Sequence, residues 1–195
     1  PLAQAQTQEA DVDAEEALQL VQEAAPLDVP LASGGGFDDG AVTVISASAD
    51  VEVTVPEAPE DLITLDPGPT NGPSTPTVAI SLPEQVSTEN GQVSESGAVV
   101  YPDDGAGVDV VVQPVEDGSV RINTVVHEAD SPHQFTYQRS LPDSATLQEQ
   151  QDGSIAILNG PTFIGGVAAP WATDAAGNDV PTTYQINGHA LTQHV

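Results

Sequence analysis

The 195-residue chain contains no cysteine, no methionine and no lysine, and its only fixed cations are Arg121 and Arg139. Without cysteine it has no disulfide framework, no thiolate nucleophile and no cysteine-ligated zinc. Without a patch of Lys and Arg it cannot neutralise the phosphates of nucleic acid or bind to an anionic membrane surface. No apolar run approaches the ~18 to 20 residues that span a bilayer. These absences exclude nucleic acid as a partner and exclude membrane insertion.

The residues present in excess are acidic ones. Thirty Asp and Glu give a formal net charge of -28, and Gly and Pro contribute 17 residues each. Pro1 stands where an initiator Met would be, so we expect a processed, mature secreted chain. The lack of Lys leaves trypsin few cleavage sites, and the lack of Cys and Met leaves oxidants few targets. We therefore expect a secreted protein, extracellular or at the cell surface.

One segment, residues 9–25, has a helical pattern. Its apolar residues recur at spacings of three and four from Ala14 to Ala25, and a proline follows. A disordered acidic tail is the alternative, because only Leu18 and Val21 on this face are large. Isolated helices shorter than ~15 residues are marginal.

From residue 41 onward, apolar residues alternate with small or polar ones, which is the period of half-buried strands. The pattern predicts strands at residues 41–45, 51–55, 62–65, 77–82, 108–113, 120–126, 135–140, 155–158, 163–167, 184–186 and 190–192. Asp117-Gly118 and Asn187-Gly188 supply the tight turns of two hairpins. Short strands at close intervals predict an all-β, mainly antiparallel fold, with one or two small β-sandwich-like halves and a short N-terminal α-helix.

We expect three parts along the chain. Residues 1–36 form an acidic helical segment and a Gly-rich linker, residues 37–97 a first β-rich part, and residues 98–195 a second β-rich domain. Residues 66–76 hold four prolines and two glycines, so they form a loop or a boundary between halves.

Two acidic loops are candidates for calcium. Residues 103–109 place Asp103, Asp104 and Asp109 around two glycines, and residues 174–179 offer a similar set. Neither loop matches the spacing of an EF-hand, and ordinary turns require the same residue types. Plain turns are the favoured interpretation, with calcium as the alternative, and we assign no metal or cofactor residues.

The histidines are His127, His133, His189 and His194. The first two bracket Glu128, Asp130 and Ser131, which are residue types found in metal sites and hydrolytic sites. However, no nucleophile elbow or zinc-binding helix motif accompanies them. We therefore predict a solvated loop, no catalytic residues and a protein that is not an enzyme.

Two further residues have recognisable environments. Arg139 shares a strand face with Phe135 and Tyr137, so it is expected to lie over an aromatic ring or to pair with a buried carboxylate. Trp171, the only Trp, stands beside Pro170 and could serve as a ligand platform. Carbohydrate-binding sandwiches usually present several aromatic side chains, so a position in the core, or as a plug at its end, is the favoured interpretation for Trp171.

The second half of the chain resembles a known type of module. The run VVYPDDGAGVDVVVQPVEDGSV that begins at residue 99, the APWA of residues 169–172 and the VPTTYQINGHALTQHV of residues 180–195 occur in this order. The chain thereby resembles an uncharacterised module of secreted proteins from high-GC Gram-positive bacteria, the actinobacteria, best over residues 99–195. The resemblance implies no catalytic or binding residue. Similar proteins continue past the position of Val195, which suggests a C-terminal cut or a shortened relative.

These observations favour a non-catalytic extracellular structural or interaction module that self-assembles at or near the cell surface. Its expected partner is another protein chain, with an end segment such as residues 9–25 docking onto a neighbouring copy. The alternative is a pro-segment or N-terminal fragment cleaved from a larger secreted precursor.

Overall fold

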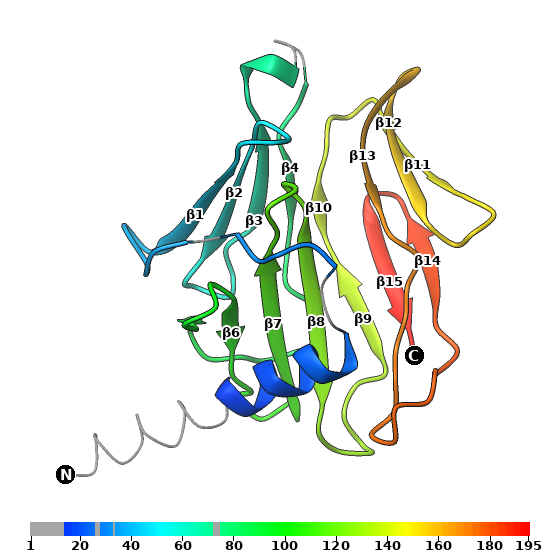
Figure 1. Ribbon diagram of the computed structural model, residues 1–195. Coiled ribbons are helices and arrows are strands. Elements are labelled where there is room, and N and C mark those ends of the chain that lie inside the picture. Colours follow the sequence, from blue (N-terminus) through cyan, green and yellow to red (C-terminus); the bar gives the residue numbers. More distant parts are fainter. Residues whose placement is uncertain (1–13, 26–27, 33, 72–74) are drawn as a thin grey trace.

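We analysed a computed structural model that describes residues 14–25, 28–32, 34–71 and 75–195. The described residues form fifteen strands in four antiparallel sheets, one α-helix over residues 14–24 and one 3-10 helix, η1 (Pro69–Asn71) (Figure 1). The all-β fold class with a short N-terminal helix is therefore confirmed. Residues 9–13 of the expected helix lie outside the described residues.

Two larger sheets and two smaller ones make up the fold. The five-stranded sheet has the order β1 (Ala41–Ser46), β2 (Val51–Pro56), β3 (Ile63–Pro67), β4 (Val78–Ile80), β10 (Arg139–Ser140). The four-stranded sheet has the order β5 (Gln92–Val93), β6 (Val99–Tyr101), β7 (Val108–Pro114), β8 (Val120–Val126). The two three-stranded sheets have the orders β11 (Ala145–Glu149), β12 (Ile155–Asn159), β13 (Thr162–Val167) and β14 (Thr183–Asn187), β15 (Ala190–His194), β9 (Gln134–Tyr137).

The two larger sheets face each other as a β-sandwich. Their inner faces contribute to one core, in which Val42 and Val53 of the five-stranded sheet pack with Val110 and Val112 of the four-stranded sheet. The alternation predicted for β1 and β2 is observed, because every second residue of β1 is buried. Tyr101 of β6 adds a polar link across the core by donating a hydrogen bond to the Pro56 carbonyl.

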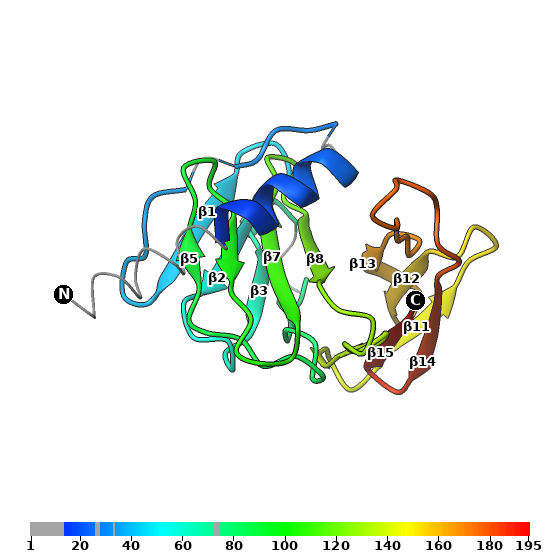
Figure 2. The same ribbon diagram turned by 90° about the horizontal axis from the view of Figure 1, so that it is seen from below.

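The helix covers the outer face of the four-stranded sheet (Figure 2). Ala17, Leu18 and Val21 pack against Val100 and Val111 of that sheet. Strand β7 is consequently buried on both faces along its whole length. The helix face predicted to be apolar is therefore the one that packs on the four-stranded sheet. The helix gains its stability from this packing.

The segment that follows the helix is also bound to the sandwich. Leu31 forms a β-bridge with Val115, and the Ala32 amide donates to the Pro114 carbonyl at 3.0 Å. The part of the expected linker between residues 28 and 32 is thus anchored by backbone pairing. The expected boundary between residues 97 and 98 lies in the β5–β6 hairpin, and strands from both sides of it share the sandwich core.

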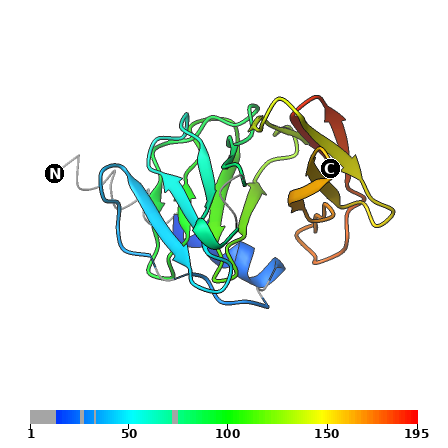
Figure 3. The same ribbon diagram turned by 90° about the horizontal axis from the view of Figure 1, so that it is seen from above.

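The C-terminal strands form a second body beside the sandwich (Figure 3). The prediction of one continuous strand at residues 135–140 is wrong, because the strand is interrupted at Gln138. Its first part, β9, pairs with β15, whereas its second part, β10, pairs with β4. The backbone carbonyl of Gln138 accepts a hydrogen bond from the Ser81 amide. The backbone amide of Gln138 donates one to the Ser81 hydroxyl. This crossing joins the two bodies.

Candidate functional site

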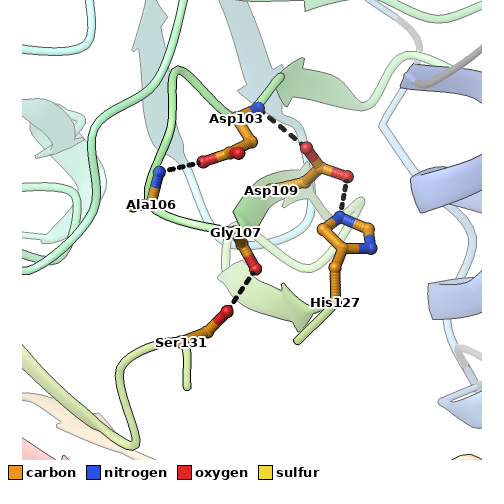
Figure 4. A network of polar contacts seen from close by, with 6 residues as sticks. All are labelled: Asp103, Ala106, Gly107, Asp109, His127 and Ser131. Atoms are coloured by element: carbon orange, nitrogen blue, oxygen red, sulfur yellow. Dashed lines mark hydrogen bonds and ion pairs between the residues drawn. The ribbon is translucent and has the colours of Figure 1, made fainter. Parts of the chain in front are cut away.

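The most extensive polar network near the predicted candidates links the acidic loop at residues 103–109 to His127 (Figure 4). Asp103 follows β6, Asp109 belongs to β7, and His127 follows β8. The β7–β8 hairpin brings the last two together, because its register pairs Asp109 with Val125, two residues before His127. Hairpin geometry therefore creates the cluster.

Asp109 is the centre of this network. One of its carboxylate oxygens accepts a hydrogen bond from the Asp103 amide at 2.8 Å, and the other lies 2.7 Å from His127 Nε2. The Asp109 side chain is only 5% exposed, whereas that of His127 is 39% exposed. A buried carboxylate is costly unless it is paired, so His127 offsets the burial of Asp109.

The Asp103 carboxylate shapes the loop itself. It accepts a hydrogen bond from the Ala106 amide at 2.7 Å. Burial raises the pKa of Asp103, but the backbone amides of residues 105–108 lower it by more, so its pKa lies below the usual range. The ionised carboxylate is thus the form that holds the turn.

Ser131 closes the network without offering a nucleophile to His127. Its hydroxyl donates to the Gly107 carbonyl at 3.1 Å, while His127 Nε2 is held by Asp109. A nucleophilic serine requires a base within hydrogen-bond reach of its hydroxyl. Gly107 has φ +70°, and a Cβ there would collide with Ser131, so glycine is required at this contact. The arrangement works as a clasp between two loops.

The acidic loops use their leading aspartates as backbone caps. In the second loop, Asp174 accepts hydrogen bonds from the amides of Ala176 and Asn178, and the side-chain bond from Asn178 lowers the pKa of Asp174 most. Within residues 14–25, 28–32, 34–71 and 75–195, no group of three or more His, Asp or Glu side chains is placed to hold a metal ion.

The two arginines join elements of the fold. Arg121 donates to the Ala25 carbonyl at 2.8 Å and so caps the C-terminal end of the helix. Arg139 donates through Nε to the His189 carbonyl at 2.8 Å, which ties β10 to the β14–β15 turn. Both terminal nitrogens of Arg139 are buried and have no hydrogen-bond partner among the residues that the structure describes, and burial lowers the pKa of Arg139 to about 10. The alternative of a buried carboxylate partner for Arg139 is therefore wrong.

Three exposed apolar side chains were not singled out as exposed from the sequence. Ile45 is 68% exposed, Phe163 64% and Trp171 45%. The prediction that Trp171 lies in the core is wrong, because it sits in the segment after β13 that turns toward the last hairpin with its ring partly in solvent. Exposed large apolar residues of this kind mark contact surfaces when their surroundings support one.

Comparisons with protein-family models, with curated proteins and with solved structures found no match. Among the helical residues that the structure describes, no helix has the length and apolar character needed to cross a membrane. Function is therefore inferred from local geometry alone.

Proposed function

We propose that the protein is a non-catalytic, extracellular structural and interaction module that self-assembles by pairing strand β1 of one copy with β1 of a second copy. One observation carries this proposal: β1 is an edge strand with free backbone groups and no charged residue. The acidic, cysteine-free composition supports an extracellular setting, and the engaged state of His127 and Ser131 supports a role without catalysis.

Edge strands of monomeric proteins normally carry protection against pairing with other chains. Lysine, proline, bulges and inward-pointing charges are the usual devices. Strand β1 has the sequence AVTVIS and pairs only with β2, in an uninterrupted register from Ala41 to Ser46. It contains none of these devices, although 16% of the chain is charged.

The alternation of hydrogen-bonded and non-hydrogen-bonded pairs between β1 and β2 shows which backbone amides and carbonyls of β1 have no partner in β2. The Glu57 amide donates to the Gly40 carbonyl, so residues 42, 44 and 46 bond to β2 and the intervening residues face the edge. At the start of the strand, Asp38 and Ala41 exchange both backbone bonds. Thr43 and Ile45 make no backbone bond outside the β1–β2 pair within the described chain, so the edge is open at these residues.

Two copies can pair at this opening about a two-fold axis through Val44. Thr43 of each copy then lies opposite Ile45 of the other, and each such pair exchanges both backbone hydrogen bonds of an antiparallel ladder. The exposed Ile45 side chain loses solvent on the same face. A closed, isologous contact of this kind produces a dimer.

The same register predicts a dependence on salt. It brings two strongly acidic molecules into contact, and charges of like sign repel each other. Each copy also carries a formal charge of -28. Screening should therefore strengthen the association as ionic strength rises.

The hypothesis from the sequence assigned the docking element to residues 9–25. Residues 14–24 instead pack as a helix on their own sheet, with Ala17 and Val111 fully buried in the contact. We therefore assign self-assembly to β1 and the helix to the stability of the single chain.

The test is molar mass by light scattering across protein concentration, at low and at physiological salt. The parent chain should approach a dimer as concentration and salt rise. Thr43→Pro should remain monomeric, because it removes a free edge amide that β2 does not use. Thr43→Val is the matched control, because it keeps that amide, and it should associate like the parent chain.

Thermal melting of the Pro and Val variants must first show that both are folded. A parent chain that stays monomeric under all these conditions would overturn the proposal. Association of Thr43→Pro equal to that of Thr43→Val would overturn the assignment to β1.

A further inference from the structure

The outer face of the β11–β13 sheet differs from the rest of the molecule in exposing an aromatic ring. On the inner face, Ala145, Ile155 and Ile157 are buried. Alternation therefore directs Ala156 and Leu158 to the outer face. Their partners across the sheet are Gln148 and Thr146 of β11 and Gly166 and Phe163 of β13.

A bulge in β13 places Phe163 over a glycine. The register shifts between Ile157 and Leu158, so one extra residue of β13 lies between the two pairs. Phe163 and Gly166, three residues apart, consequently share the outer face. A Cβ on Gly166 would stand 3.6 Å from the Phe163 ring, which shows that the ring lies against the glycine backbone. One face of the Phe163 ring therefore packs against the Gly166 backbone, while 64% of the side chain stays exposed to solvent.

A shallow hollow of about 410 Å³ lies beside this ring. Its lining includes Gln150, Ser154 and Ala156 as well as Phe163 and Gly166. The side-chain amide nitrogen of Gln150 donates a hydrogen bond to the Gln148 backbone carbonyl. The side-chain oxygen of Gln150 has no hydrogen-bond partner in the described chain. The hollow therefore combines one aromatic face with neutral groups that can donate and accept hydrogen bonds.

One carboxylate borders the hollow, because Asp152 accepts hydrogen bonds from the amide of Ser154 at 3.0 Å and from its hydroxyl at 2.7 Å. Among the residues of β11, β12 and β13, only Glu149 is charged, and it alternates to the face opposite Gln148. Only five of the 30 carboxylates of the chain follow residue 130, and they belong to Asp143, Glu149, Asp152, Asp174 and Asp179. The acidic surface elsewhere on the molecule favours cationic ligands. This face has few carboxylates, so a neutral ligand can bind here without carrying a positive charge.

We propose that the outer face of the β11–β13 sheet binds a neutral oligosaccharide, with the Phe163 ring stacked on a sugar ring. A pyranose has an apolar face that fits a flat, exposed aromatic ring and a rim of hydroxyl groups that fits amides and hydroxyls. Gln148, Gln150 and Thr146 supply those polar groups. Ligand sites generally combine one apolar surface with a few polar groups that fix orientation.

An apolar peptide is the competing occupant of this face. Such a peptide would require several apolar contacts, whereas Phe163 is the only large apolar side chain on this face that is exposed. Leu158 is half-buried, and the remaining side chains are small or neutral and polar. Carbohydrate-binding sandwiches usually present several aromatic rings, but one ring is enough to stack one sugar unit, so these observations favour a sugar held through a single ring. The inference does not depend on self-assembly, which uses a different sheet.

The test uses the full chain and isothermal titration with cellohexaose, maltohexaose, mannohexaose and chitohexaose as separate probes. We expect at least one of them to bind the parent chain. Phe163→Tyr should bind it with affinity similar to the parent, because the ring is retained. Phe163→Leu should lose about tenfold or more, because an aliphatic side chain keeps the apolar contact and loses the flat ring.

Leu62→Ala is the matched control, because it removes an apolar side chain that is 40% exposed and lies just before β3 in a different sheet, and it should bind like the parent chain. Thermal melting confirms that each variant is folded. Three results would overturn the proposal: no binding of any of the four probes at about 10 mM, unchanged affinity in Phe163→Leu, or an equal loss in Leu62→Ala. The absence of binding by all four probes would favour the apolar-peptide alternative.

Discussion

At the residue scale, His127 and Asp109 show how a hairpin register creates an interaction that the sequence alone does not display. They are 18 positions apart, whereas Glu128 and Asp130 are the acidic residues next to His127 in the sequence. The signal was present in the Asp117-Gly118 turn, because a hairpin closed there pairs residue 109 with residue 125. Extending the hairpin register from this turn places Asp109 near His127. Glu128 and Asp130 lie beyond the paired strands, and the structure has both of them exposed to solvent.

His127→Ala should lower the free energy of unfolding by about 1–3 kcal/mol, because it leaves the buried Asp109 carboxylate short of a partner. Chemical denaturation at neutral pH measures the change. His133→Ala is the matched control: His133 is exposed, and within the described residues its side chain makes one hydrogen bond, to the Ala129 carbonyl at 3.2 Å, so its loss should stay within about 0.5 kcal/mol. Equal effects of the two substitutions would contradict the clasp.

Arg139→Ala should lower the free energy of unfolding by about 2 kcal/mol, because it opens a cavity and leaves the His189 carbonyl unpaired. Arg139→Met is the companion variant. It keeps most of the packing volume and removes a buried charge whose terminal nitrogens have no partner, so it should lose less than Arg139→Ala. A change within about 0.5 kcal/mol for Arg139→Ala would show that Arg139 does not join the two bodies.

At the scale of elements, period and turn chemistry predicted most strands and both tight hairpins. Gly118 and Gly188 adopt φ +84° and +59°, as those turns require. The pattern missed β5 and β6 because they are short, and β6 because it is buried throughout and so shows no alternation. It also missed β11, whose outward residues Thr146 and Gln148 made the segment resemble a loop. The break at Gln138 could not be predicted, because it depends on pairing with Ser81, which is distant in sequence.

Several turns are closed by an aspartate that accepts hydrogen bonds, and this predicts a dependence on pH. The side-chain and backbone hydrogen bonds from Ser119 lower the pKa of Asp117 below its usual value of 3.8. A carboxylate with a lowered folded-state pKa adds stability that is present above 3.8 and is lost as pH falls through the folded-state pKa. The benefit of the ionised Asp117 should therefore disappear in strong acid.

Comparing the parent chain with Asp117→Asn isolates this effect, because acid also relieves the repulsion of the -28 charge in both proteins. Thermal melting from neutral pH down to about pH 2 should show the parent chain as the more stable above 3.8. The difference should shrink below that pH. A difference that is constant with pH would show that the ionised carboxylate does not close the turn.

At the scale of the whole molecule, charge and apolar surface are separated. Carboxylates concentrate in the first 130 residues, on and around the sandwich, whereas only five follow residue 130, in the part of the chain that carries the exposed Phe163 and Trp171. Within the sandwich, β1 is the longest edge strand without a charged residue, and the two-residue β5 is the other. The proposed contacts therefore lie where the acidic surface is interrupted. Composition predicted the acidic surface, but the interruptions depend on register and on strand order.

The most direct test of self-assembly through β1 is amide hydrogen exchange at residue resolution, recorded at low and at high protein concentration in physiological salt. The amides of Thr43 and Ile45 should exchange rapidly in the dilute protein and become protected as the dimer forms. Those of Val42 and Val44, which already bond to β2, provide the internal reference. Protection that does not change at Thr43 and Ile45 while the molar mass doubles would contradict the account.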